Sequence, residues 1–371
     1  MTNLGLPVQP VTLGLFEKRF DGDDQLMELA RLRFQQAKMG TEIYAVTPEV
    51  LEWTMRFRPE GRLPVVAHLS RGMKLTDPGS HHQIENFARR FAGQVLGFVI
   101  HDEPDLAHHP RLYQQAAETL NAQLRRVENC PRVFIEYAVG LELEPFMNFF
   151  ESIRGLDHIS ACVDIGHVGI QQTRKAYSKI HPGQDVCQLK SQPMQIPQAM
   201  PDLEQALATA LPAVLNLIET LGKLGKPVHF HLHDGHPLST FSPFGVSDHL
   251  SFLTEVPLNF EHHGQRHTGL MFGPAGLNQI AGQALQAFSG QPLSFTLEIH
   301  PIGNCLPLDD AAELFKSWRD KTNAEKMNHW LSVLQKNHQL LHDAIRTATK
   351  PIAPPKNTAP LQCQSARCHS I

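Results

Sequence analysis

The chain has 371 residues, of which 42% are hydrophobic and 19% charged, and its formal net charge is −4. So mild a charge gives no general attraction to nucleic acid or to an anionic membrane. No apolar stretch approaches the roughly 18 residues of a membrane span, the start lacks a signal-peptide pattern, and the six cysteines contain no CxxC pair. We therefore expect a cytoplasmic protein kept in a reducing compartment.

Short apolar runs alternate with helical patterns along the chain. The runs that we interpret as strands are 11–16, 41–46, 63–69, 95–101, 132–137, 160–165, 228–233 and 293–299. The helical patterns are 23–38, 48–57, 83–91, 112–127, 144–153, 203–224, 277–288 and 311–346. Alternation of this kind predicts an α/β fold, a (β/α)8 TIM barrel in a single domain over residues 1–349. Residues 350–371 are rich in Pro, Ser and Ala, and we expect a disordered C-terminal tail.

Two connections are too long to be simple turns. They cover residues 168–202 and 235–276, after the sixth and seventh strands. Both would lie at the end of the barrel where enzymes of this fold keep their active sites. We therefore expect long loops that serve as lids or as walls in contact with a substrate.

A polar residue stands at or near the end of six strands. In chain order these residues are His68, His101, Glu136, Asp164, His231 and Glu298. Each one alone could be a hydrogen-bonded core residue, but three carboxylates and several imidazoles in one barrel mouth would be very unfavourable without a counter-charge. A divalent metal ion supplies that charge. Oxygen and nitrogen ligands together suit Zn²⁺, Mn²⁺, Co²⁺ or Mg²⁺, and the imidazole favours the transition metals.

The seventh strand has an unusual pattern, VHFHLHDGH over 228–236, in a chain with 22 histidines. Because side chains alternate along a strand, His229, His231 and His233 would share one face. Neutral imidazoles on such a face serve as metal ligands or proton carriers. The alternative is a histidine-rich edge strand that faces solvent.

The motif Asp164-Ile165-Gly166-His167 ends the sixth strand. We expect Gly166 to allow a sharp turn that brings Asp164 and His167 to the same rim. The motif alone is a weak signal, but after a fully apolar strand it is fairly specific.

Together these residues resemble the xylose isomerase-like barrel superfamily, which includes sugar isomerases and epimerases and the AP endonucleases of the endonuclease IV type. The resemblance covers residues 11–346. It implies that four residues hold the metal, namely Glu136, Asp164, His231 and Glu298. The further positions that it marks for metal or substrate binding are His68, His101, His167, His233, Asp234, Asp248 and His249.

For the isomerases and epimerases, the resemblance implies proton transfer next to a carbonyl group through a metal-stabilised enediolate. Glu136 and Glu298 would then be both metal ligands and acid/base groups, while His167 would steady a substrate oxygen. The expected substrate is a small sugar or polyol, and the expected cofactor is one divalent metal ion.

Two alternatives stay open. An endonuclease IV-like multi-zinc phosphodiesterase would use the extra histidines of strands three and four and the pair Asp248 and His249. The mild charge, with no clustered Lys or Arg in the mouth loops, argues against a nucleic-acid substrate. A non-catalytic metal-binding barrel is the other alternative. About one ion per chain would indicate the isomerase and three the phosphodiesterase; a homo-oligomer is compatible with either.

Overall fold

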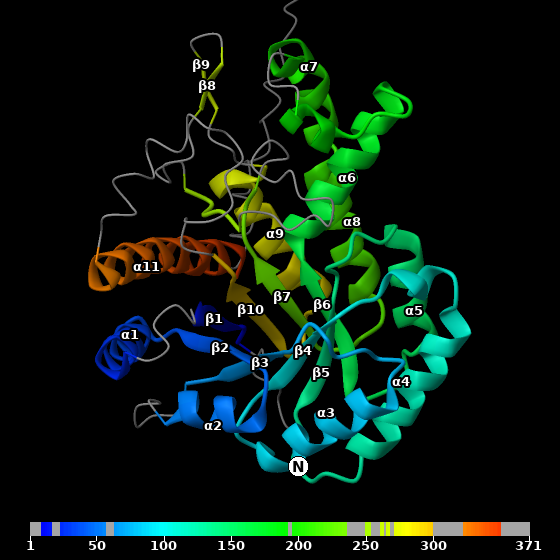
Figure 1. Cartoon of the computed structure of the whole chain (residues 1–371), viewed down its shortest axis with the longest axis vertical. Coiled ribbons are helices and arrows are strands. Elements are labelled where there is room, and N and C mark those ends of the chain that lie inside the picture. Colours follow the sequence, from blue (N-terminus) through cyan, green and yellow to red (C-terminus); the bar gives the residue numbers. More distant parts are fainter. Residues whose placement is uncertain are drawn as a thin grey trace, which may run out of the picture.

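The computed structural model describes residues 9–16, 23–56, 63–191, 195–235, 249–253, 260–262, 265–267, 271–299 and 322–349. Its parallel strands close into one barrel in the order β1-β10-β7-β6-β5-β4-β3-β2 (Figure 1). These strands are β1 (Val11–Phe16), β2 (Gly40–Ala45), β3 (Val65–Leu69), β4 (Gly97–His101), β5 (Arg132–Glu136), β6 (Ile159–Asp164), β7 (Val228–Leu232) and β10 (Leu293–Leu297). The predicted (β/α)8 TIM barrel is therefore confirmed.

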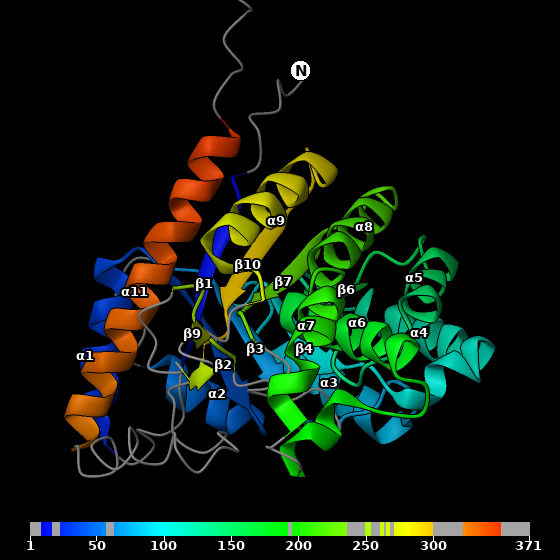
Figure 2. The ribbon, with the colours of Figure 1, turned by 90° about the horizontal axis from the view of Figure 1, so that it is seen from above.

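Helices surround the barrel on its outer side (Figure 2). They are α1 (Asp24–Gln36), α2 (Pro48–Met55), α3 (Pro78–Arg90), α4 (Pro110–Leu124), α5 (Leu143–Ser152), α6 (Ile165–Ile180), α7 (Ile196–Leu207), α8 (Ala210–Gly222), α9 (Gly273–Ala287) and α11 (Asn323–Ala348), with the short 3₁₀ helices η2 (Pro104–Ala107) and η3 (Val186–Ser191). Side-chain caps and prolines in the first turn explain several helix starts; Asp77 accepts hydrogen bonds from the backbone of α3, whose first residue is Pro78.

The barrel has an apolar interior below its polar mouth. The buried cluster inside the sheet consists of Leu13, Val66, Val99, Phe134 and Cys162. Four of these residues precede a polar strand-end residue by two positions, so they share its face of the strand. A much larger apolar layer between the strands and the helices contains the bulk of the core. The fold thus directs the polar ends of the strands into one crowded mouth.

The connection after β6 differs from the long loop that the sequence suggested. Helix α6 begins at the residue that follows β6, and η3 and α7 come after it. Tyr177, Leu189 and Leu203 belong to a small apolar cluster that packs these segments on one another. The helical periodicity is hard to see in the sequence because polar and glycine residues interrupt the first turns of α6. We call α6, η3 and α7 the arm; these helices rise above the barrel in Figure 1.

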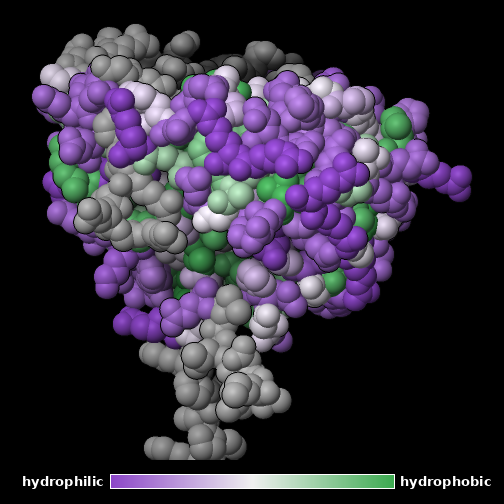
Figure 3. All heavy atoms as spheres, turned by 90° about the horizontal axis from the view of Figure 1, so that it is seen from below, coloured by the Kyte–Doolittle hydropathy of each residue, from purple (hydrophilic) through white to green (hydrophobic). Residues whose placement is uncertain are grey.

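The connection after β7 is described only in part. It contains the antiparallel strand pair β8 (Phe260–His262) and β9 (Gln265–His267), and an isolated bridge that pairs Asp234 with Leu250. Residues 311–321 of the last predicted helix and the predicted tail, 350–371, lie outside the described residues. Within the described part of the chain no helix is both long and apolar enough to cross a bilayer. The face seen from below is mostly hydrophilic, with small apolar patches (Figure 3).

Candidate metal centre

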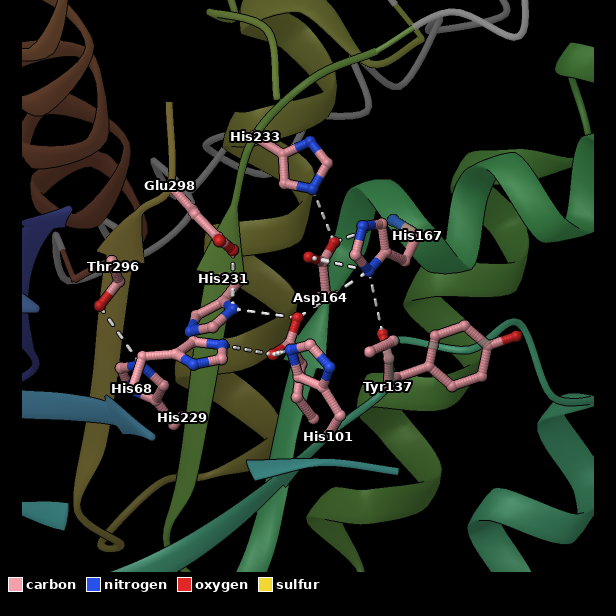
Figure 4. Close-up of polar contacts among 12 residues, drawn as sticks. His68, His101, Tyr137, Asp164, His167, His229, His231, His233, Thr296 and Glu298 are labelled. Carbon is pink, nitrogen blue, oxygen red and sulfur yellow. Dashed lines mark hydrogen bonds and ion pairs between the residues drawn. The ribbon is translucent and has the colours of Figure 1, made fainter. Parts of the chain in front are cut away.

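The six polar strand-end residues lie together at one end of the barrel (Figure 4). Parallel register brings them to a common height, because His101 is the partner of Glu136 and Asp164 is the partner of His231. Most of these side chains are buried; His101, with 20% of its side chain exposed, is the most open. The mouth therefore combines charge with exclusion of water.

The possible ligand atoms of the described residues form four groups, three of which are linked by two shared carboxylates. The first group is His68, His101 and Glu136; the second is Glu136, Asp164, His231 and Glu298; the third is Asp164, His167, His233 and His249. Within each group the atoms lie within 4.8 Å of one another. Glu136 joins the first group to the second, and Asp164 joins the second to the third. Each group could hold a metal ion.

In the first group, His68 faces a carboxylate with one of its two ring nitrogens. Its Nδ1–H donates to the carbonyl oxygen of Leu69 over 3.0 Å, so Nε2 faces Oε2 of Glu136, also at 3.0 Å. His101 Nε2 lies 3.4 Å from the same oxygen. Burial lowers the pKa of His101 to about 4, so this imidazole is neutral and able to bind a cation.

The second group is centred on His231. Its Nδ1 atom lies 2.8 Å from Oε2 of Glu298 and 3.4 Å from Oε1 of Glu136. Burial alone would raise the pKa of Glu136, but the neighbouring imidazoles, His231 foremost, hold it well below its usual value. Tyr44 donates a hydrogen bond of 2.7 Å to the other oxygen of Glu298, which orients that carboxylate.

The third group repeats the arrangement of the first. His233 Nδ1–H donates to the carbonyl oxygen of Asp234 over 3.0 Å, and Nε2 lies 2.8 Å from Oδ1 of Asp164. Burial would lower the pKa of His233, but Asp164 raises it to about 9. His167 Nδ1 is 3.3 Å from the other oxygen of Asp164, and His249 stacks on His233 with ring centroids 4.1 Å apart.

Three buried atoms of these groups test whether a cation fits. Asp164 Oδ2, His167 Nε2 and His231 Nδ1 make no hydrogen bond within the described part of the chain, although the first and the last lie 3.3 and 2.8 Å from their ion-pair partners His167 and Glu298. Leaving such an atom unsatisfied costs about 1–3 kcal/mol, more for a charged group. Carboxylate oxygens and imidazole nitrogens are the ligands that zinc and related divalent ions use. The residues present therefore fit divalent metal ions.

The Asp164–His167 motif is built by the start of α6. Asp164 is the N-cap residue, and its Oδ1 accepts a hydrogen bond of 2.9 Å from the backbone N–H of His167. Gly166 was expected to permit a sharp turn, but it lies inside α6 with no positive φ. It is needed for space instead, because a Cβ atom there would overlap the imidazole ring of His233.

Asp234, marked as a possible ligand by the resemblance, belongs to none of the three groups. Its buried carboxylate accepts hydrogen bonds from the backbone N–H groups of Gly235, Met271, Phe272 and Gly273, at 2.6–3.3 Å. It thus ties together the two ends of the long connection after β7. Asp248 lies outside the described residues, whereas its neighbour His249 reaches the third group.

Sequence reasoning missed Glu42, which is fully buried in the middle of β2. Its Oε1 is 2.9 Å from Nε2 of His231 and its Oε2 is 3.0 Å from Nε2 of His229. Burial opposes its charge, but the two imidazoles keep its pKa far below the usual value. The available signal was one carboxylate between Thr41 and Ile43 in an otherwise uncharged strand.

A fourth group, Cys162, His229 and His231, lies next to the second. It shares His231 with that group, and burial raises the pKa of the Cys162 thiol far above its ordinary value. The thiol is therefore protonated and a poor ligand at neutral pH. We assign this group to the polar lining beneath the mouth.

No family model and no curated protein matches the chain. Among solved structures, "The crystal structure of AsfvAP:AG" has a TM-score of 0.45 and 14% identity, covering 85% of this chain and 89% of that one. The carboxyl transferase domain of Rhizobium etli pyruvate carboxylase with 3-bromopyruvate has a TM-score of 0.36 and 14% identity; it covers 90% of this chain, which spans 48% of that one. Likenesses this distant carry no argument about chemistry, so function has to be inferred from the side chains.

Proposed function

We propose that this chain is a metal-dependent phosphodiesterase whose mouth holds three divalent ions. The observation that carries the proposal is the linkage of the three ligand groups through Glu136 and Asp164. A carboxylate that bridges two groups is what brings neighbouring ions close enough to act on one substrate. Zn²⁺ suits the mixture of imidazole and carboxylate ligands best.

Several ions suit phosphate ester cleavage because charge develops on both the attacking and the leaving oxygen and on the oxygens of the phosphoryl group. Bound divalent ions would supply Lewis acidity and lower the pKa of a coordinated water. An enediolate, by contrast, needs only one ion. His68 and His101, which a single-ion isomerase does not require, therefore favour phosphodiester cleavage.

The residues of the chain have separable tasks in this proposal. Glu136 and Asp164, each shared by two groups, would each contribute a ligand to two neighbouring ions. His101, the most open ligand, marks the side from which a substrate phosphate reaches the first group. Glu298 and His231, both buried, close the inner side of the mouth and exclude bulk water, which strengthens electrostatic stabilisation there.

The second candidate function is sugar isomerisation or epimerisation, with a sugar or polyol as substrate. The observation that favours it is the position of Glu136 and Glu298 about His231, whose Nδ1 is 3.4 Å from one carboxylate and 2.8 Å from the other. One central ion and two flanking carboxylates could move a proton between adjacent carbons.

Metal content and two activities distinguish the candidates. We expect three ions per chain by mass spectrometry, together with hydrolysis of bis(4-nitrophenyl) phosphate and of duplex DNA that contains an abasic site. His101→Ala should lose one ion and most of the hydrolysis, while His108→Ala, at an exposed histidine outside the three groups, serves as the control. One ion per chain with proton exchange on a sugar would overturn the proposal in favour of the isomerase. Bound metal with neither activity would indicate the non-catalytic barrel.

A further inference from the structure

Each metal-ligand group contains one histidine whose two ring nitrogens have different tasks. In His68 and His233, Nδ1–H donates to a backbone carbonyl of the next residue and Nε2 faces a carboxylate of the mouth. In His231 the roles of the nitrogens are reversed. Its Nε2 contacts Oε1 of Glu42 at 2.9 Å and its Nδ1 faces Glu298. The central histidine is thus held by a carboxylate and the outer ones by neutral carbonyl groups.

Glu42 reaches His231 through the interior of the barrel. In the sheet, β2 and β7 are separated by β1 and β10, so this contact crosses the barrel and is not made between neighbouring strands. The second oxygen of Glu42 accepts from Nε2 of His229, whose Nδ1 in turn accepts from the hydroxyl of Ser294 at 2.7 Å. With both oxygens engaged and no exposed surface, this carboxylate has one fixed orientation.

We propose that Glu42 is a positioning residue that sets His231 as the central ligand, with Nε2 protonated and Nδ1 bare toward the metal. This inference rests on the proposed metal centre, but not on the reaction carried out there. A carboxylate behind a metal-bound imidazole fixes its tautomer and strengthens it as a ligand, and loss of such a partner typically weakens metal affinity about 10–100-fold.

The tautomer can be tested in the wild-type chain without any assay of turnover. In ¹⁵N-labelled protein loaded with ¹¹³Cd²⁺, we expect cadmium to couple to Nδ1 of His231 and to Nε2 of His68 and His233. Coupling to Nε2 of His231 would overturn the role of Glu42 even if the protein hydrolyses phosphodiesters. The expected coupling without hydrolysis would instead overturn the proposed function and leave the role of Glu42 standing. A chain that binds no cadmium would overturn both.

Variants test the strength of the effect. Glu42→Gln keeps the shape of the side chain but removes its charge, so we expect the central ion to bind about 10–100-fold more weakly while the outer ions are unchanged. Glu42→Asp should restore part of the affinity. Glu103→Gln is the matched control, because that carboxylate accepts hydrogen bonds from Leu75 and Tyr113 away from the histidines. Equal affinity for the central ion in Glu42→Gln and wild type would contradict the proposal.

A separate observation points to a second kind of cation site, between α11 and β1. His338 and His342 are four residues apart on α11, and their Nε2 atoms lie 3.2 Å from each other. The hydroxyl oxygen of Thr12 on β1 is 2.9 Å from the first of these nitrogens and 3.4 Å from the second. One hydroxyl proton and one N–H cannot satisfy all three contacts well, because each proton has one preferred direction.

Two of the three distances, 3.2 and 3.4 Å, are close to the edges of a tetrahedral zinc site, and the 2.9 Å contact with Thr12 is shorter. With Zn–N bonds of about 2.0–2.1 Å, neighbouring ligands lie about 3.3–3.4 Å apart. Two histidines four residues apart on a helix are a common way to bind zinc. Burial, followed by the proximity of His342, lowers the pKa of His338 to about 4, so its imidazole is neutral at physiological pH. We infer that His338, His342 and Thr12 bind a divalent transition metal ion that fastens α11 to β1.

Calorimetric titration of the full chain with Zn²⁺, after the mouth has been loaded, tests this site. We expect one additional ion that is absent in His342→Ala, a change at an exposed position that should leave the fold intact. Thr12→Val should weaken this ion alone. His82→Ala removes another exposed helical histidine and is the control. An additional ion that persists in His342→Ala, or no additional ion in the wild type, would refute the site.

Discussion

Nδ1 of His231 lies 2.8 Å from Oε2 of Glu298, a carboxylate oxygen that can only accept a hydrogen bond. The other ring nitrogen of His231 already carries its proton, because its partner, a carboxylate oxygen of Glu42, can only accept. Two acceptors this close repel unless a proton or a metal ion lies between them. The same relationship recurs between His68 and Glu136 and between His233 and Asp164.

Glu298→Gln should abolish turnover while leaving the fold intact. The amide keeps the volume of the side chain but removes a ligand charge, so metal content should fall by one ion. Loss of several kcal/mol of transition-state stabilisation corresponds to at least about 1,000-fold in kcat/KM. Glu85→Gln, which only breaks an exposed pair with Arg89, should retain full activity. Undiminished turnover in Glu298→Gln would show that Glu298 is not an essential ligand of the metal centre.

Removal of metal should destabilise the protein. The mouth contains buried carboxylates whose charges the ions offset, and a site filled at a hundredfold excess over its Kd contributes about 2.7 kcal/mol. We therefore expect chelation to lower Tm by about 5 °C or more, and Zn²⁺ to restore it. Calorimetry before and after chelation measures this change. An unchanged Tm would argue against tightly bound ions.

Asp234→Ala should lower stability without changing metal content. It leaves four backbone N–H groups without their acceptor at the base of the connection after β7, at a cost of about 3 kcal/mol or more. Asp234→Asn retains one acceptor oxygen and should cost less. Denaturant unfolding and metal analysis together check the assignment. Loss of an ion with unchanged stability would instead identify Asp234 as a ligand.

Gly166→Ala should displace His233 and release the third ion. Helix propensity alone would favour alanine by about 1 kcal/mol, but the added Cβ would overlap the His233 ring inside a packed site, and the overlap should dominate. Gly155→Ala is the control, since a Cβ there meets no neighbouring atom. We expect metal analysis to find two ions per chain in Gly166→Ala and three in Gly155→Ala.

Stability of the metal-free protein should fall in acid partly through His338. Its pKa is lowered to about 4 in the folded state, whereas an unfolded histidine has a pKa near 6.5. Its contribution is therefore fully present above about pH 6.5 and is lost as pH falls toward 4, with an upper limit of about 3 kcal/mol. His338→Phe should flatten this part of the stability profile. If the free energy of unfolding varied with pH in the same way in wild type and variant, the pKa of His338 would not differ between the folded and unfolded states.

The barrel could be predicted because its strands are continuous apolar runs, and the mouth because polar residues interrupt those runs at their ends. His68, Glu136 and Asp164 converge as expected from strand ends alone. That logic does not reach Glu42, which stands in mid-strand and meets His231 only after the barrel closes. Such a contact depends on curvature and closure, which local periodicity does not encode.

Two other differences have local causes. Asp234 resembles a ligand in sequence, but its carboxylate is occupied by backbone N–H groups that arrive from residues 271–273. We expected a loop at the start of α6 because its glycine and histidine residues interrupt the helical periodicity of apolar residues, although Asp164 is a good N-cap residue. In both cases the deciding partner is a backbone group, which carries no signature of its own in the sequence.

Asp164 ends β6, caps α6 and belongs to two of the three ligand groups. Architecture and chemistry therefore depend on a single carboxylate at this point of the chain. A relative without the metal would still need an acceptor at this position to begin α6, and its buried Asp164 carboxylate would depend on His233 and His167 for counter-charge. Asparagine can cap a helix without carrying a charge, so we expect it at this position in a relative that no longer binds the metal.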